Sequence, residues 1–193
     1  CFLYSVLGYS RFPICRRQPP FDTVSTHLSK ALLWLSRCGS VPKGQSLLRI
    51  AEHCNHDEFV GWHLASWLKV YYRNEPRVFV DISPKYRKYV SYGTSAIMFN
   101  HGDALKPAKL AHLFPMEYKE EWSNHDNFYI FTGDKHHELS LDFNGIKFYQ
   151  LPAFSTAKSS WDEKNGYTVT KGEVTGFLLD YDHGMTNIFK QYL

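Results

Sequence analysis

Three short clusters of Asn, His and Asp in the sequence contain the residue types that bind divalent metal ions. They read "CNHDE" at 54–58, "NHGDA" at 100–104 and "GDKHHE" at 133–138, and each follows an apolar segment. In α/β proteins, the carboxyl ends of strands converge on one crevice. Imidazole, amide and carboxylate groups gathered there suit an ion such as Mn²⁺, Fe²⁺ or Zn²⁺. A single cluster is more often a cap or a surface loop, so only the three together indicate a metal site.

Two other chemistries are open at the first cluster. His53, Cys54 and His56 could contribute to a structural zinc site, but no C-x-x-C pair accompanies them. Cys54 beside a histidine could serve as a thiol nucleophile, although no motif that would orient a base is present. We prefer the metal-site interpretation because it applies to all three clusters.

Apolar residues at helical spacing predict the helices that position these clusters. A helix is predicted over 24–37, and a second one over 61–74. The inward face of the second helix is expected to carry Leu64, Trp67, Leu68 and Tyr71. Residues 104–122 are expected to be mostly helical, with interruptions at Pro107 and Pro115.

Compact apolar or alternating runs predict strands, and most of these lie in the second half of the chain. The predicted strands cover 77–82, 88–93, 95–100, 127–133, 138–143, 146–151, 173–181 and 185–193. Asn144-Gly145 and His183-Gly184 separate consecutive strands and favour hairpin turns. Residues 46–51 fit a strand or a helix equally well. We expect helices to dominate the first half, hairpins the second, and the whole to form an α/β fold with stacked sheets.

Composition and charge set further limits. With 193 residues, 44% hydrophobic and 17% aromatic, the chain is expected to be globular, and its net charge of +3 is too mild to indicate a nucleic-acid partner. Four cysteines without a C-x-x-C pair favour a reducing, cytoplasmic setting. No apolar run reaches the roughly 18 residues of a membrane span, so no membrane partner is expected. The basic run "KYRKY" at 85–89 could contact a phosphate backbone or form an exposed strand face.

The order N-H-D, then H-G-D, then G-x-x-H-H resembles the C-terminal half of the calcineurin-like metallophosphoesterases. That family carries five blocks: D-x-H, G-D, G-N-H-[DE], H-G and G-H-x-H. The segments "YRNEPRVFVDISPKYRKY" and "SSWDEKNGY" are similar to phage- and prophage-associated members, which resemble Mre11-like nucleases. The resemblance covers about 40–193. We therefore expect one domain, 1–193, with an atypical N-terminal segment, 1–39.

The resemblance implies a metallophosphoesterase-like fold of stacked β-sheets flanked by helices, and hydrolysis of phosphoester bonds, DNA included, by two divalent ions (Mn, Fe or Zn). Asn55 and His101 would bind one metal ion, and His136 the other. Asp134 stands where the family has the first His of G-H-x-H, and it could act as a further ligand. His56 would stabilise or protonate the leaving oxygen, and Asp57 would orient His56.

Two departures from the family pattern lead to a second expectation. Cys54 replaces the glycine of G-N-H-[DE], where a tight turn is usual. Residues 1–51 contain a single acidic residue, Asp22, which suits a helix cap, and they hold neither D-x-H nor G-D. We therefore expect a chain that lacks its original N-terminal part, beginning at Cys1. The alternative function is a catalytically impaired remnant, or a non-catalytic binding module on the same scaffold.

Overall fold

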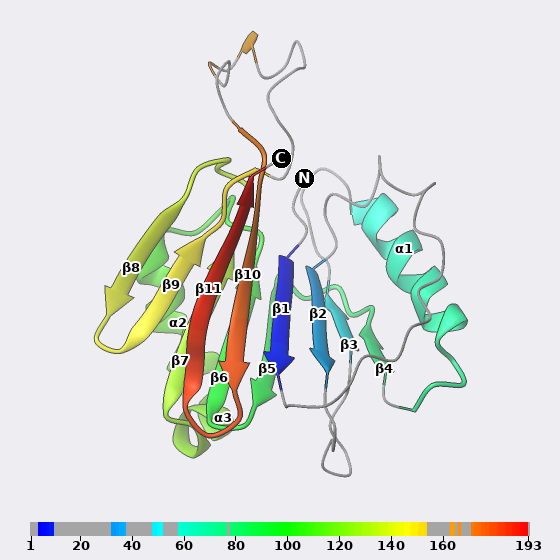
Figure 1. Ribbon diagram of the computed structural model, residues 1–193, viewed down its shortest axis with the longest axis horizontal. Helices are drawn as coiled ribbons and strands as arrows, with labels where there is room; N and C mark the ends of the chain where they lie inside the picture. Colours follow the sequence, from blue (N-terminus) through cyan, green and yellow to red (C-terminus); the bar gives the residue numbers. More distant parts are fainter. Residues whose placement is uncertain are drawn as a thin grey trace.

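The computed structural model describes residues 4–9, 32–37, 48–51, 58–76, 78–153, 163–164, 166 and 171–192. Two β-sheets lie face to face, and helices flank them (Figure 1). The first sheet has the order β11-β10-β1-β2-β3-β4: β11 (Gly184–Tyr192), β10 (Glu173–Asp180), β1 (Tyr4–Tyr9), β2 (Leu32–Arg37), β3 (Leu48–Ala51) and β4 (Val78–Asp81). The second has the order β5-β6-β7-β9-β8: β5 (Arg87–Tyr92), β6 (Ser95–Asn100), β7 (Asn127–Thr132), β9 (Ile146–Gln150) and β8 (Leu139–Phe143).

The centre of the second sheet, β6 and most of β7, is buried on both faces, since alternate side chains of a strand point to opposite sides and both sides are covered. In β6, Ile97 and Phe99 face the first sheet, where they pack with Phe177 and Leu179 of β10. Met98 faces the other way, against α2 (Pro107–Glu117), whose inward residues are Leu110, Ala111 and Phe114. All six residues of β6 are buried as a result, which explains its continuous apolar sequence.

The helices occupy the outer faces of the two sheets. In Figure 1, α2 and α3 (Lys119–Asn124) lie behind the second sheet, and α1 (Glu58–Tyr71) lies beside β4. Pro107 begins α2, as its fixed φ and missing N–H allow. Pro115 lies inside α2, so the interruption predicted there is wrong. The predicted α/β fold class, with stacked sheets flanked by helices, is confirmed.

The helix predicted over 24–37 is wrong in its last part, because Leu32–Arg37 forms strand β2. This strand pairs with β1 on one side and with β3 on the other. The run Leu-Leu-Trp-Leu has the apolar composition that is typical of a central strand. Helices do not dominate the first half of the described chain, since β1 to β6 and one helix, α1, precede His101.

The predicted inward face of α1 is confirmed at Leu68 and wrong at Trp67 and Tyr71. Ala65 and the partly buried Leu68 pack against Val80 of β4. Trp67 and Tyr71 are 58% and 57% exposed, and their rings stack on each other at a centroid distance of 5.2 Å. A small residue lets the helix approach the strand closely, so the packing face is centred on Ala65, and the two large rings are left on the outside.

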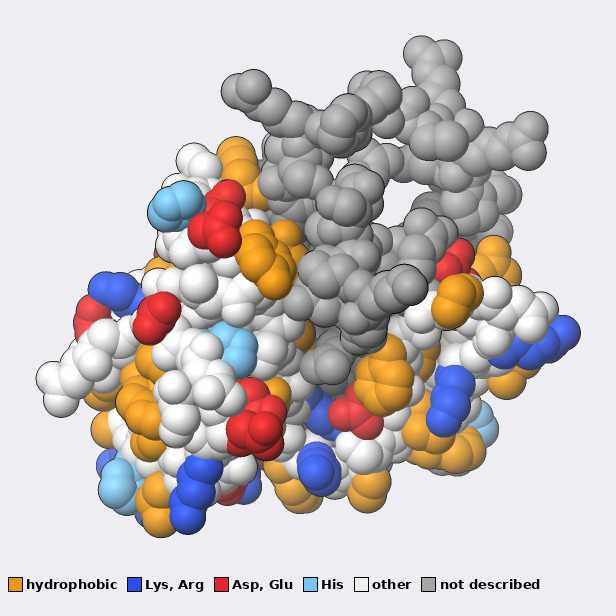
Figure 2. Space-filling model, turned by 90° about the horizontal axis from the view of Figure 1, so that it is seen from below, with side chains coloured by type: hydrophobic (Ala, Val, Ile, Leu, Met, Phe, Trp, Pro, Cys, Tyr) orange, Lys and Arg blue, Asp and Glu red, His pale blue; other side chains and the backbone are white. Residues whose placement is uncertain are grey.

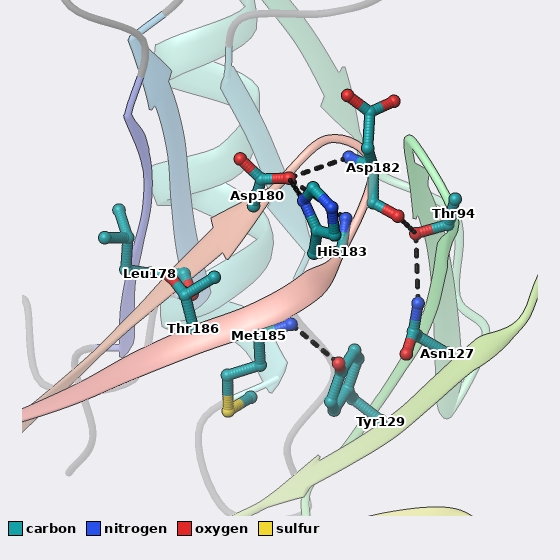
Figure 3. Close-up of polar contacts among 9 residues, drawn as sticks. All are labelled: Thr94, Asn127, Tyr129, Leu178, Asp180, Asp182, His183, Met185 and Thr186. Atoms are coloured by element: carbon teal, nitrogen blue, oxygen red, sulfur yellow. Dashed lines mark hydrogen bonds and ion pairs between the residues drawn. The ribbon is translucent and has the colours of Figure 1, made fainter.

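Both predicted hairpins are present, and the turn between β10 and β11 is tightly bonded (Figure 3). The Asp180 carboxylate accepts hydrogen bonds from the backbone N–H of Asp182 and of His183, both at 3.0 Å. Thr94 Oγ1, from the β5–β6 turn, donates to the Asp182 carbonyl at 3.2 Å. The turns of both sheets are therefore joined at this end of the molecule.

The carboxyl ends of β6 and β7 lie at the opposite end. Both strands are parallel to β9, which points to the top of Figure 1, whereas the β10–β11 turn lies at the bottom. Figure 2 shows the lower end, where side chains of both charges are interspersed with hydrophobic ones in the described part. The described surface visible there has no continuous basic patch.

Candidate functional site

The second cluster begins at Asn100, the last residue of β6, and turns sharply there. The buried Asn100 side chain donates from Nδ2 to the carbonyl of Tyr86 at 3.2 Å, and its Oδ1 accepts from the N–H of Gly102 at 3.0 Å. Gly102 has a φ of +107°, which side chains rarely tolerate. The turn therefore directs His101 away from the strand while Asn100 holds the backbone.

The ends of β6 and β7 are tied together through their backbones. The N–H of Gly133 donates to the carbonyl of His101 at 2.8 Å. A Cβ on Gly102 would lie 2.8 Å from the carbonyl oxygen of Gly133, which is closer than real Cβ contacts come. Gly102 is thus needed for this approach, and the second and third clusters meet as predicted.

The meeting point brings an imidazole and a carboxylate together. Nε2 of His101 lies 3.3 Å from Oδ1 of Asp134, and the two side chains are 12% and 23% exposed. Two ligand atoms at about 2.0–2.2 Å from one tetrahedral Zn²⁺ are about 3.3–3.6 Å apart. The pair is therefore spaced as two ligands of a single ion would be, and it forms an ion pair when His101 is protonated.

The charge of Asp134 is stabilised by its neighbours. Partial burial raises the pKa of its carboxyl, but Lys135 and the charges of His101 and His136 outweigh burial and hold the pKa below its ordinary value. Nζ of Lys135 lies 2.8 Å from Oδ2 of Asp134. One carboxylate oxygen thus faces His101 and the other faces the lysine.

The turn that carries Asp134 and His136 has an unusual backbone. These residues have φ values of +64° and +58°, in the left-handed region where Asp and His are among the more frequent non-glycine residues. Such positions cost on the order of 1–3 kcal/mol each and cluster at functional sites. The surroundings hold the turn in place, because Gln150 Nε2 donates to the carbonyl of His137 at 3.0 Å. His137 itself donates from Nδ1 to the Lys135 carbonyl at 2.8 Å.

The first cluster falls outside the described residues. Asn55, His56 and Asp57 lie in the segment between β3, which ends at Ala51, and α1, which begins at Glu58. Within the described ranges, no group of three or more His, Cys, Asp or Glu side chains is arranged to hold a metal ion. The predicted roles of Asn55, His101, Asp134 and His136 as metal ligands therefore stay predictions.

The strand part of the basic run, 87–89, is not the exposed strand face that was one of the two expectations. Lys88 is only 5% exposed, because it shares the inner face of β5 with Val90 and Tyr92. Arg87 donates to the carboxylate of Glu117 at 2.7 and 2.8 Å, and Tyr89 donates to it at 2.6 Å. Alternate residues of a strand share a face, so the spacing of Lys88 from Val90 and Tyr92 could have indicated that Lys88 is buried. Its charge suggested the opposite.

No protein-family model matches the chain, and no curated protein matches it. Similar solved structures include wild-type Vps29 with Zn²⁺ from Entamoeba histolytica, at 13% identity and a TM-score of 0.38 over 99% of this chain and 97% of that one. A double mutant of the same Vps29 matches at 14% and 0.39, over 57% of this chain and 56% of that one. A predicted phosphoesterase from Streptococcus pneumoniae matches at 10% and 0.30, over 68% and 91%. At these values the similarities carry no argument about the chemistry of this chain.

Within the described residues, no helix combines the length and the apolar character that a membrane span requires.

Proposed function

We propose that this chain is a calcineurin-like phosphoesterase that binds divalent metal ions at the ends of β6 and β7 and hydrolyses phosphoester bonds there. The observation that supports the proposal is the 3.3 Å approach of His101 Nε2 to Asp134 Oδ1 at the carboxyl ends of two parallel strands. Neutral imidazole and carboxylate ligands suit Mn²⁺, Fe²⁺ and Zn²⁺. The motif order N-H-D, H-G-D and G-x-x-H-H supports the phosphoester chemistry.

His101 and Asp134 would hold one ion, with Asn55 as a further ligand, and His136 would reach a second ion. A bound ion in such a centre lowers the pKa of water and offsets charge on the leaving oxygen. His56 would donate a proton to that leaving oxygen, and Asp57 would hold the His56 ring in orientation. Asn100 and Gly102 would fix the direction of His101 through the bonds described above.

A non-catalytic binding module is the second candidate, and one observation favours it. Lys135 forms an ion pair with Asp134 at 2.8 Å and therefore competes with a cation for that carboxylate. The sequence before Glu52 also lacks the D-x-H and G-D blocks, which would supply the bridging carboxylate in the family. In this second case the centre would bind a metal ion weakly or not at all, and the scaffold would serve to bind another protein.

The substrate class is a phosphoester, in a cytoplasmic setting that the cysteine content favours. Nucleic acid as the substrate depends on the resemblance to Mre11-like nucleases. The charges of the 85–89 run give no added support, since Arg87 is paired with Glu117 and Lys88 is buried.

Metal-dependent hydrolysis of bis-p-nitrophenyl phosphate tests the proposal. We expect the unaltered chain to bind Mn²⁺ or Zn²⁺ by calorimetry and to hydrolyse the ester, and His101→Ala and His56→Ala to lose most of the activity. His183→Ala is the matched control, because this exposed histidine lies at the opposite end of the molecule. Metal binding without hydrolysis would support the binding module. Hydrolysis that is indifferent to chelator and to both site variants would exclude the proposed centre.

A further inference from the structure

A cavity of about 400 Å³ lies between the two sheets, at the end opposite the candidate metal site. Its walls come from the start of β7, from the β8–β9 hairpin and β9, and from the start of β11. A volume of this size is typical of sites for small organic molecules. The side chains that line the cavity therefore indicate which kind of molecule it suits.

The strand register puts three polar side chains on one wall of the cavity. Tyr129 of β7 pairs with Lys147 of β9, and Tyr149 follows two residues after Lys147. Paired residues and alternate residues of neighbouring strands share a face of the sheet. This face is the inner one, since Tyr129 and Tyr149 pack with Phe177 of the first sheet. Two phenols and one ammonium group thus lie on the same wall.

A bulge in β11 shapes the facing wall. The pairing of β11 with β10 skips Thr186, whose Oγ1 donates to the Leu178 carbonyl at 3.3 Å. The N–H of the preceding residue, Met185, donates to the Tyr129 hydroxyl at 2.7 Å, as Figure 3 shows. Bulges re-aim side chains and are frequent next to active sites. This one ties the facing walls together at the Tyr129 hydroxyl.

The hydroxyl groups of Tyr129 and Tyr149 have protons to donate. Tyr129 is only 5% exposed, and its oxygen accepts from Met185, so its own proton needs another partner. In the part of the chain that the structure describes, neither hydroxyl donates to an acceptor. Burial, with Tyr129 adding to the effect, outweighs the charge of Lys147 and raises the pKa of Tyr149, which keeps its phenol protonated. A buried donor without an acceptor is costly, so an acceptor atom in the cavity would stabilise both groups.

Lys147 adds positive charge to the same wall, and the rest of the lining is partly apolar. The lysine side chain is half exposed and forms an ion pair with Asp142, which uses one of the three N–H donors of its ammonium group. Phe128, Met185 and Ile188 supply apolar surface. The lining therefore suits a molecule with an anionic, hydrogen-bond-accepting head and an apolar body.

From this arrangement we propose that the cavity binds a small aromatic carboxylate. The ligand carboxylate accepts hydrogen bonds from the hydroxyls of Tyr129 and Tyr149 and shares Lys147 with Asp142. The ligand ring packs against Phe128 and Met185, since aromatic rings and thioether groups make favourable contacts with a ring. The site is independent of the proposed metal centre, because it lies at the other end of β7.

Benzoate is the probe, and benzamide, which has the same ring without the charge, is the matched comparison. Both are titrated into the full chain labelled with ¹⁵N, and the amide signals of Met185, Gly145 and Gly133 are followed. Met185 and Gly145 line the cavity, whereas Gly133 lies at the candidate metal site. We expect benzoate to shift the first two signals and not the third, and to bind about tenfold more tightly than benzamide. No shift, an equal shift at Gly133, or benzamide binding as tightly as benzoate would overturn the proposal.

Two variants test the residues that would hold the carboxylate. Tyr149→Phe removes only the unused hydroxyl, and Lys147→Met removes the charge, so each is expected to weaken benzoate binding about tenfold. Tyr181→Phe is the control, since this partly exposed tyrosine packs on Tyr92 outside the cavity lining. Thermal unfolding compares the stability of the variants, so that a loss of binding is separated from a loss of fold. Unchanged benzoate affinity in both site variants, or an equal loss in Tyr181→Phe, would show that these residues do not form a carboxylate site.

Discussion

Nε2 of His101 lies 3.3 Å from Oδ1 of Asp134, although the two residues follow different strands. The hydrogen bond from the Gly133 N–H to the His101 carbonyl fixes this approach, and the parallel pairing of β6 with β7 brings both strand ends to the same edge. The pair is therefore preorganised by the backbone rather than by the side chains alone. Changes to either side chain should alter metal binding with little effect on the fold.

Replacing Asp134 with Asn should weaken Mn²⁺ or Zn²⁺ binding by at least about tenfold, because a neutral amide loses the charge attraction for the ion. Isothermal calorimetry measures the change. Asp180→Asn provides the control, since Asp180 pairs with His183 in the β10–β11 turn at the opposite end. Equal affinities in the unaltered chain and the Asp134→Asn variant would show that Asp134 is not a ligand.

The stability contributed by Glu117 should depend on pH. Hydrogen bonds from Arg87 lower the pKa of Glu117 against partial burial, with Tyr89 adding to the effect. A carboxyl with a lowered folded pKa stabilises the fold above its unfolded pKa of about 4.3, and this contribution is lost as the pH falls through the folded value. We expect Glu117→Gln to cost about 1 kcal/mol at pH 7, given the partial exposure, and clearly less at about pH 3.5, which lies below the unfolded pKa. Urea unfolding at both pH values measures the difference. An equal cost of the Glu117→Gln substitution at both pH values would contradict the lowered pKa of Glu117.

Gly102→Ala should destabilise the protein more than Gly145→Ala. Both glycines have positive φ values, +107° and +93°, but only at Gly102 would the added Cβ also meet backbone atoms, the carbonyl of Gly133 at 2.8 Å. We expect a loss of about 1 kcal/mol for Gly145→Ala and about 2–3 kcal/mol for Gly102→Ala. Thermal unfolding compares the two, and a larger loss at Gly145 would be inconsistent with the contact.

Trp67→Ala should cost less than Leu68→Ala, although tryptophan is the larger residue. Trp67 is more than half exposed and contacts mainly Tyr71, whereas Leu68 packs on the cluster of Ala65 and Val80. The expected losses are below about 1 kcal/mol for Trp67 and about 2 kcal/mol for Leu68. Chemical denaturation checks the order, and a reversed order would place Trp67 in the core.

The second half of the fold could be predicted well from the sequence because its signals are local. Asn144-Gly145 indicates a hairpin because both residues tolerate positive φ values, and their φ values in the structure are +50° and +93°. The apolar runs that end at Asn100 and Thr132 indicated neighbouring strands, and parallel pairing then brought His101 and Asp134 together.

Other features depend on contacts that the local sequence does not reveal. Leu32–Arg37 satisfies helical spacing and strand composition alike, and only the pairing with β1 and β3 decides for a strand. Lys88 carries a charge that suggests exposure. Its burial depends on Asp81 and Ser83, which accept hydrogen bonds from its ammonium group. The inner face of α1 was misjudged for a similar reason, since the small Ala65 rather than the large Trp67 sets the approach to β4.

The interlocked turns at the end opposite the candidate site have a consequence for how the protein is made. A Cβ on Gly93 would lie 1.8 Å from the Tyr181 carbonyl oxygen, and the neighbouring Thr94 bonds to Asp182, 88 positions along the chain. β10 also supplies Phe177 and Leu179 to the core between the sheets. During synthesis on the ribosome, that core cannot close until β10 has emerged, and contacts of such high sequence separation form slowly. We therefore expect the nascent chain to expose the inner faces of β6 and β7 until residues up to Asp180 have been synthesised, and to depend on chaperones during that time.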